Sequence, residues 1–169
     1  IFSTHSGTRV GETLNLKWKN VEFNQHKQKN KCSLDLTITG KVGTRDCYSY
    51  FGSYFALNKV KELFKKYDIQ ISPDDYVFQR NFKKGLNELL HDCNLKFVEE
   101  NGRTLRRDAK SFRSTYISWM LMRGKTHDEI RLNCGTSVGM IEKFYSKYIK
   151  IQKYKKSLTE ISNTKSLYL

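Results

Sequence analysis

The sequence lacks the features that would place it in a membrane, in a disulfide-bonded scaffold or at a metal centre. Its 169 residues contain no apolar run approaching the roughly 18 to 20 residues that a membrane helix requires. The four histidines do not gather at ligand spacing, and the four cysteines are far apart: Cys32, Cys47, Cys93 and Cys134. Neither a disulfide framework nor a zinc site is therefore predicted. We expect a soluble, intracellular protein with reduced thiols and no membrane partner.

Acidic residues are scarce relative to basic ones. Lys and Arg number 31 and Asp and Glu number 17, which gives a formal net charge of +14. With 38% hydrophobic and 13% aromatic residues, the composition is typical of a folded basic domain and not of a disordered tail. This excess of basic residues predicts nucleic acid as the partner, and surface charge that only keeps the protein soluble is the alternative.

The length is sufficient for one domain and leaves no room for a second large one. The chain contains a single proline, no internal repeat and no low-complexity segment. It begins at Ile1 and not at methionine, and it reaches a charged functional candidate at Arg9. We therefore expect the natural N-terminus to lie upstream.

Hydrophobic periodicity predicts a mostly helical chain with one small sheet. Leu34, Leu36 and Ile38 alternate as in a half-buried strand over residues 32–39, and residues 40–46 then form a turn before a returning strand at 47–51. Residues 21–23 suggest a further short strand, and residues 95–103 read as a connecting segment. Helical spacing recurs over 8–16, 53–68, 81–94, 106–122, about 126–133 and about 137–149. In the helix at 81–94, the residues expected to face inward are Phe82, Leu86, Leu89 and Leu90.

Candidate functional residues occur first at two places in the N-terminal half. Arg9 and Glu12 are three apart at a helix start, where a guanidinium can face a phosphate while a carboxylate orients it. An ordinary surface ion pair is the alternative. Lys41 stands at the hairpin turn, from which an ammonium could protonate a departing oxygen. A solvated loop lysine is the alternative there.

Two further places lie in the C-terminal half. Lys110 and Arg113 project on the same side of a helix with an apolar interior, so Arg113 must find an anion, either a protein carboxylate or a ligand phosphate. Tyr145 could attack a phosphodiester if cations neutralise the charge on the non-bridging oxygens. Residues 126–145 also read as a helix-turn-helix with Gly135 at the turn, in which Tyr145 is only a packing aromatic.

Together these segments resemble the catalytic domain of the tyrosine recombinase, or phage integrase, family. The resemblance extends over about residues 3–149 in order and spacing. Arg113 falls where the family has its second arginine. The matching motifs are Ser6-Gly-Thr-Arg-Val-Gly-Glu12 with Leu16-Lys-Trp18, Thr39-Gly-Lys-Val-Gly-Thr-Arg45, and Cys134-Gly-Thr-Ser-Val-Gly-Met-Ile-Glu-Lys-Phe-Tyr145.

The resemblance implies an α+β, mostly helical catalytic domain over residues 1–149, with a small antiparallel β-sheet near the N-terminus. The family's DNA-clamping domain lies outside this chain, and residues 150–169 form a tail that could pack against another subunit. The implied enzyme is a site-specific recombinase or integrase that breaks and rejoins DNA through a 3′-phosphotyrosyl link on Tyr145. Arg9 and Arg113 would hold the phosphate, and Lys41 would protonate the leaving 5′ hydroxyl.

The chain departs from the family pattern at two residues. Lys110 takes a histidine position and Thr136 stands where histidine or tryptophan is usual, and both are expected to assist catalysis. No metal or cofactor is implied. The implied partners are double-stranded attachment sites, three further copies in a homotetramer and DNA-bending accessory proteins, in the cytoplasm at the nucleoid. Lys143, Lys147 and Lys150 are expected to follow the DNA backbone. A non-enzymatic helix-turn-helix regulator and a type IB topoisomerase-like enzyme are the alternatives.

Overall fold

The computed structural model of the chain describes residues 1–41, 43–100 and 102–145. The predicted tail at 150–169 and the predicted DNA-binding residue Lys147 therefore lie outside the described residues, as does Lys150 at the start of the tail. No helix in this part of the chain is long and apolar enough to cross a membrane. A last helical segment covers residues 138–145. The elements before it are α1 (Phe2–Ser6), α2 (Val10–Leu14), β1 (Val21–Asn24), β2 (Ser33–Gly40), β3 (Gly43–Ser49), α3 (Phe51–Lys66), α4 (Lys83–Asp92), β4 (Phe97–Glu100), β5 (Arg103–Arg106), α5 (Lys110–Met122) and α6 (His127–Cys134).

The first hydrophobic cluster lies between the three-stranded sheet and α3. The sheet is antiparallel in the order β1-β2-β3, and Leu36 at its centre pairs with both Val21 and Cys47. The alternation in β2 places Leu34, Leu36 and Ile38 on the inner face at 0–1% exposure, which confirms the predicted strand. These side chains pack with Leu57 of α3, whose buried side is what the helical period in that segment predicts.

The hairpin between β2 and β3 is tighter than predicted. Gly40 pairs with Gly43, so β3 begins at Gly43 and the turn predicted over residues 40–46 was too long. Gly43 has φ +108°, a conformation that glycine adopts without strain. The exposed polar residues that follow Gly43 read as a loop in the sequence, whereas ladder hydrogen bonds make them a strand. Arg45 is consequently a strand residue, opposite Ile38.

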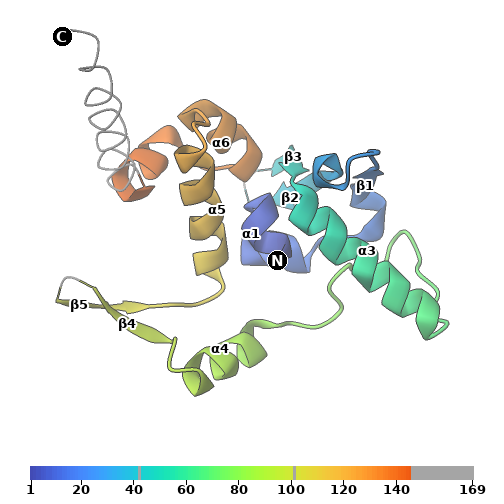
Figure 1. Cartoon of the computed structure of the whole chain (residues 1–169), viewed down its shortest axis with the longest axis horizontal. Coiled ribbons are helices and arrows are strands. Elements are labelled where there is room, and N and C mark those ends of the chain that lie inside the picture. The colour runs from blue at the N-terminus through green and yellow to red at the C-terminus, as the bar shows by residue number, and fades with distance from the viewer. Residues whose placement is uncertain (42, 101, 146–169) are drawn as a thin grey trace, which may run out of the picture.

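The second cluster lies between α5, α6 and the helix at 138–145. Its buried members are Tyr116, Ile117, Met120, Leu121, Ile130, Cys134 and Ile141. The short helix α1 contacts both α3 and α5 and so joins the two clusters, which lie on opposite sides of it in Figure 1. Gly7, at φ +67°, ends α1, and a Cβ there would collide with the Tyr116 ring and the Cys134 Sγ. Close packing at Gly7 therefore brings the clusters together.

The helix α4 and the β4–β5 hairpin project away from both clusters (Figure 1). The expectation that residues of α4 face inward was wrong for Leu89, which is 59% exposed; Phe82, Leu86 and Leu90 are half-buried, and no residue of α4 is fully buried. The segment predicted as a connection forms the hairpin, in which Phe97 pairs with Arg106, and α5 therefore starts at Lys110 and not at residue 106. Both strands are rich in charged residues, so neither shows the alternation that predicts a half-buried strand.

Candidate functional site

A cationic cavity of about 630 Å³ collects side chains from distant parts of the sequence. Arg9 at the start of α2, Arg113 of α5 and Tyr145 of the last helix all line it. Its remaining lining residues are Val10, Lys83, Asn87, Arg106, Asp108, Ala109, Lys110 and Ser114. Five basic side chains thus face one acidic side chain, Asp108. Such a cavity is suited to an anion that carries more than one charge.

Arg9 is the N-cap of α2, one residue before the helix in which it was predicted. Its backbone N–H and its Nη1 each donate a hydrogen bond to Glu12 at 2.8 Å, and its Nη2 donates to the carbonyl oxygen of Gly135. The side chain is 43% exposed. Arg9 is therefore held on one side by protein acceptors and open to the cavity on the other.

Glu12 is a buried carboxylate and not part of an exposed surface pair. Its side chain is 4% exposed and accepts two hydrogen bonds from Arg45, at 3.0 and 2.8 Å, in addition to those from Arg9. Burial alone would raise the pKa of Glu12, but the hydrogen bonds from Arg45 and Arg9 outweigh it and lower the pKa to about 2. Arg45 was missed as a site residue, although it closes the motif around Lys41 and a buried Glu12 requires a cationic partner.

This carboxylate makes stability dependent on acidic pH. The folded-state pKa of about 2 lies below the ordinary 4.5, so the contribution is complete above pH 4.5 and is lost as the pH falls toward 2. The difference corresponds to about 3 kcal/mol of unfolding free energy. We expect Glu12→Gln to be about 3 kcal/mol less stable than wild type at pH 7, with the gap narrowing below pH 4.5, in urea titrations across pH.

The control for this change is Glu62→Gln, which removes an exposed pair with Lys59. It should alter the unfolding free energy by less than about 1 kcal/mol at any pH. A gap between wild type and Glu12→Gln that stays constant from pH 7 to pH 3 would contradict a charged Glu12 in the folded protein.

Arg113 lies on α5 with its Nη1 donating to the carbonyl oxygen of Gly7 at 2.8 Å. Within residues 1–41, 43–100 and 102–145, no ion pair joins it to a carboxylate, and its burial lowers the pKa of the guanidinium. Lys110, one turn earlier on the same helix, is exposed and also lines the cavity. This half-buried guanidinium lines the cavity, where it can donate further hydrogen bonds to an anion.

Tyr145, on the helix at 138–145, lines the same cavity. Its hydroxyl lies 3.2 Å from the Ser114 hydroxyl, while its half-buried ring packs on the second cluster. Ser114 comes directly after Arg113 on α5 and also lines the cavity, so α5 and the last helix are in contact there. Sequence reasoning missed Ser114, because a serine on a helix carries no signal of its own.

Two of the predicted catalytic residues, Lys41 and Thr136, do not line the cavity, and neither do the predicted supporting residue Glu12 and the predicted DNA-binding residue Lys143. Lys41 is exposed at the end of the β2–β3 hairpin, and Thr136 follows Gly135 with its backbone N–H donating to the Arg131 carbonyl oxygen at 3.3 Å. Lys143 is exposed on the helix that carries Tyr145. Among the described residues, no group of three or more His, Cys, Asp or Glu side chains could hold a metal ion.

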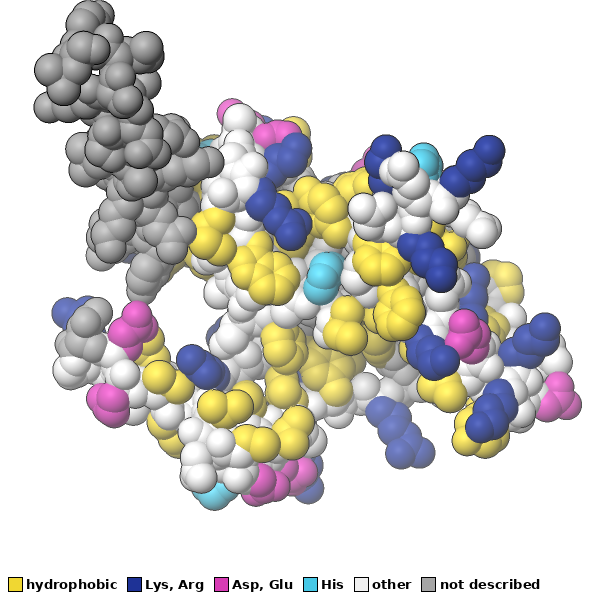
Figure 2. Space-filling view, in the orientation of Figure 1, with side chains coloured by type: hydrophobic (Ala, Val, Ile, Leu, Met, Phe, Trp, Pro, Cys, Tyr) yellow, Lys and Arg dark blue, Asp and Glu magenta, His cyan; other side chains and the backbone are white. Residues whose placement is uncertain are grey.

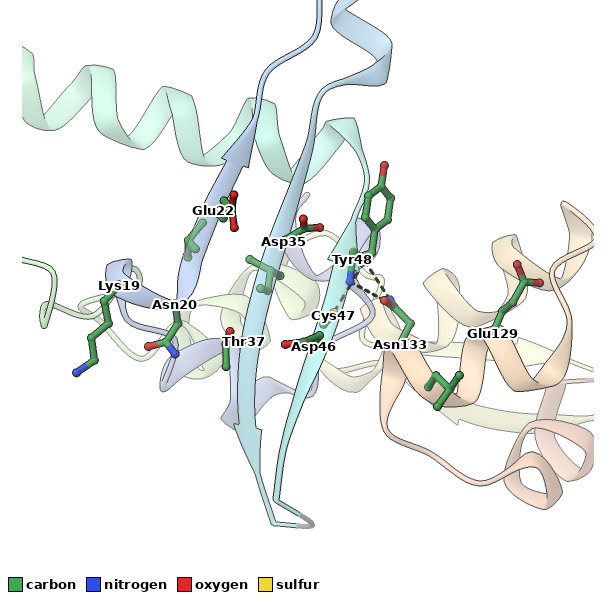
Figure 3. Close-up of a pocket in the computed structure, with 13 residues that line it drawn as sticks. Lys19, Asn20, Glu22, Asp35, Thr37, Asp46, Cys47, Tyr48, Glu129 and Asn133 are labelled. Atoms are coloured by element: carbon green, nitrogen blue, oxygen red, sulfur yellow. Dashed lines mark hydrogen bonds between the residues drawn. The ribbon is translucent and has the colours of Figure 1, made fainter.

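A second cavity, of about 690 Å³, lies over the sheet beside α6 and has the opposite character (Figure 3). Its charged lining is mainly acidic: Glu22, Asp35, Asp46 and Glu129, with Lys19. Asn133 of α6 is bonded to β3 here, since Tyr48 N–H donates to its side chain at 2.7 Å and its amide donates to the Tyr48 carbonyl at 3.1 Å. These bonds fix the C-terminal end of α6 against the sheet.

No protein-family profile matches the chain, and no curated protein matches its sequence. Its fold is similar to that of solved recombinases. XerA recombinase aligns with a TM-score of 0.64 at 17% identity, over 92% of this chain and 56% of that one. The XerH site-specific recombinase bound to palindromic difH substrate, in a post-cleavage complex, aligns at 0.62 and 17%, over 92% and 42%. The Tn1549 transposon integrase, in complex with transposon right end DNA, aligns at 0.52 and 14%, over 90% and 56%.

The chain thus spans about half the length of these structures. It has the tyrosine recombinase and integrase fold, and the predicted class is confirmed: an α+β, mostly helical domain with a small antiparallel sheet near the N-terminus.

Proposed function

We propose that this protein is a site-specific DNA recombinase or integrase that breaks and rejoins strands with Tyr145 as the nucleophile. The observation that carries the proposal is a cationic cavity lined by Arg9, Arg113 and Tyr145, of which Arg9 precedes the other two by more than 100 residues in the sequence. Its fold neighbours XerA, XerH and the Tn1549 integrase support the same function.

The proposed chemistry exchanges one phosphodiester for another. The Tyr145 oxygen gives its proton to solvent and attacks the phosphorus, the bond to the 5′ oxygen breaks, and a 3′-phosphotyrosyl bond forms; the lysine that protonates the 5′ oxygen regains a proton from solvent. Arg9 and Arg113 neutralise the charge on the non-bridging oxygens, because forked guanidinium donors fit two phosphate oxygens at once. A 5′ hydroxyl can then attack the phosphotyrosyl bond and reseal the strand, so no nucleotide cofactor is needed.

The departing 5′ oxygen must receive a proton. Two lysines are proposed for this step: Lys110, which lines the cavity, and Lys41, at the end of the hairpin. Thr136 is proposed as a further phosphate contact through its hydroxyl. The test is covalent capture on nicked duplexes drawn from the DNA that flanks the protein's own gene, resolved on a denaturing gel. A tyrosine-dependent shifted band supports the proposal.

DNA affinity should fall steeply with salt, because the chain carries +14 and basic side chains project from both halves of the face in Figure 2. With about six phosphate contacts, the affinity should drop about 10³-fold between 50 and 200 mM salt. Lys143→Gln should weaken binding alike for all sequences and reduce the slope of log K against log salt by about one. Fluorescence anisotropy with a labelled duplex measures both.

Lys59→Gln is the matched control, because Lys59 is an exposed lysine already paired with Glu62 on α3. Its salt slope should equal that of the wild type. Binding that hardly changes over the same salt range would overturn the assignment of Lys143 to the DNA backbone. Lys147 and Lys150, proposed for the same role, lie outside the described residues.

A helix-turn-helix regulator is the alternative that the sequence left open, with α6 ending at Gly135 (φ +62°) before the helix at 138–145, but the fold neighbours do not favour it. That function predicts specific DNA binding without any covalent adduct, and it gives the cavity around Arg9 and Arg113 no role. A type IB topoisomerase-like enzyme would instead relax supercoiled plasmid without a particular site. Parallel adduct and relaxation assays separate the three functions.

The proposed assembly follows from the same likeness. Residues 1–149 would act as the catalytic domain, with residues 150–169 packing against a neighbouring copy in a homotetramer on two attachment sites, aided by DNA-bending accessory proteins. Sedimentation of the protein with and without duplex DNA tests this arrangement, and a complex containing one copy per duplex at saturation would contradict it.

A further inference from the structure

Arg45 is a tightly bonded charged side chain near the cavity, and the proposed chemistry does not use it. Its side chain is 17% exposed, it does not line the cavity, and all three of its guanidinium nitrogens donate to protein acceptors. Two of them take both oxygens of Glu12, and Nε donates to the carbonyl oxygen of Asn133 at 3.1 Å. Three of its five N–H groups are therefore engaged with the protein, and its guanidinium is held in a fixed orientation.

Glu12 passes this constraint on to Arg9. Each Glu12 oxygen is shared: Oε1 accepts from Arg45 Nη1 and Arg9 Nη1, and Oε2 accepts from Arg45 Nη2 and the Arg9 backbone N–H. The carboxylate therefore cannot rotate without breaking bonds to both arginines. The hairpin backbone closes over it, since a Cβ at Gly40 would lie 2.7 Å from Oε1. The orientation of Arg9 thus depends on a side chain that lies outside the cavity.

The same two arginines hold the end of α6. Arg45 donates to Asn133 O and Arg9 to Gly135 O, which are carbonyl groups that the end of a helix leaves without partners. Gly135 has no room for a side chain, because its Cβ would lie 2.9 Å from Arg45 Cζ. From here the chain runs into the helix that carries Tyr145.

We propose that Arg45 is a positioning residue that sets the direction of the Arg9 guanidinium through the shared carboxylate of Glu12. The proposal rests on the proposed function for its effect on DNA cleavage, whereas its effect on Arg9 can be measured without DNA. Lysine cannot replace Arg45 fully, because one ammonium cannot bond both carboxylate oxygens and Asn133 O in the same fixed geometry.

The kinetic test compares a duplex with an ordinary scissile phosphodiester and one with a methylphosphonate, which lacks the negative charge that Arg9 would neutralise. On the phosphodiester, Arg45→Met should slow single-turnover cleavage about 100-fold, as expected for a misplaced catalytic group, and Arg45→Lys should recover only part of the rate. On the methylphosphonate, the fold-loss in cleavage rate should be smaller than on the phosphodiester, both for Arg45→Met and for Arg9→Met. An equal loss on both substrates, or an Arg45→Met loss that multiplies fully with that of Arg9→Met, would overturn the proposal.

The second test is independent of cleavage. In the full chain labelled with ¹⁵N-arginine and free of DNA, NMR should show slow rotation of the Arg9 guanidinium in the wild type and faster rotation in Arg45→Met, with Arg45→Lys as the substitute if the methionine variant does not fold. Arg131→Met, which removes an exposed pair with Asp128, should leave the Arg9 signals unchanged. Unchanged Arg9 rotation in both Arg45 variants would refute the positioning role. If the wild type forms no adduct but the Arg9 guanidinium rotates faster in the Arg45 variants, the proposed function fails and the positioning role stands.

Discussion

Tyr145→Phe is expected to abolish the covalent protein–DNA adduct while leaving the fold and the affinity for duplex DNA nearly intact. Removal of a nucleophilic oxygen should lower the rate of strand cleavage by about 10⁴-fold or more. The structure shows why the fold should survive: the half-buried ring provides the packing on the second cluster, and the hydroxyl makes one contact, of 3.2 Å, with Ser114. Covalent capture on nicked duplexes, with DNA binding measured in parallel, separates a loss of strand cleavage from a loss of DNA binding.

Tyr67→Phe is the matched control, because Tyr67 is 65% exposed at the end of α3 and does not line the cavity. It should form the adduct at the wild-type rate. An adduct that persists in Tyr145→Phe would assign the nucleophile to another residue. Specific binding with no adduct from the wild type, on any cleavable duplex, would favour the helix-turn-helix regulator.

Arg113→Met is expected to lose about 10² to 10³-fold in the cleavage rate, the range for removal of one preorganised donor to a charged transition state. The same change should leave the unfolding free energy unchanged or raise it. In the folded chain Arg113 is half-buried, its pKa is lowered by burial, and its Nη1 donates a hydrogen bond to the Gly7 carbonyl oxygen. Replacing a buried charge that lacks a carboxylate partner by an apolar chain of similar length relieves a cost of burial.

A slower cleavage rate together with an unchanged or raised unfolding free energy would show that Arg113 serves binding of the phosphate and not stability of the fold. Arg45→Met supplies the contrast, because Arg45 is paired with Glu12 and its loss leaves that carboxylate buried and uncompensated. Urea titration and single-turnover cleavage on both variants give the comparison. A marked loss of stability in Arg113→Met would support a structural role for this arginine.

The sequence predicted best where a single physical pattern dominates. Alternating Leu34, Leu36 and Ile38 made β2 recognisable because a strand with one buried face shows a period of two. The motif order around Arg9, Arg113 and Tyr145 identified three residues that line one cavity, although no periodicity could show that they meet. Their meeting depends on the docking of two clusters, which only the tertiary structure reveals.

Prediction failed where apolar residues are not buried by the chain itself. Leu89 was placed inward because helices usually bury their leucines, yet α4 projects from the clusters and leaves it exposed.

The hairpin between β2 and β3 was a second place where prediction failed. Arg45 was read as part of a turn, and its bonds to Glu12 and Asn133 depend on a strand register that the glycines at positions 40 and 43 made hard to recognise. The place of Lys41 outside the cavity is likewise a property of the hairpin's direction and not of its motif.

The bonds across the two clusters have a consequence for synthesis of the protein on the ribosome. The Arg45–Glu12 pair joins segments that are synthesised before α6, and the sheet can begin to pack with α3 once residue 66 has left the exit tunnel. The bond from Arg45 to Asn133 spans 88 residues and the bond from Arg9 to Gly135 spans 126, so both must wait for α6. A nascent chain therefore has its arginines and its sheet before the end of α6 can hold them, and the cavity can be complete only after residue 145 has left the tunnel.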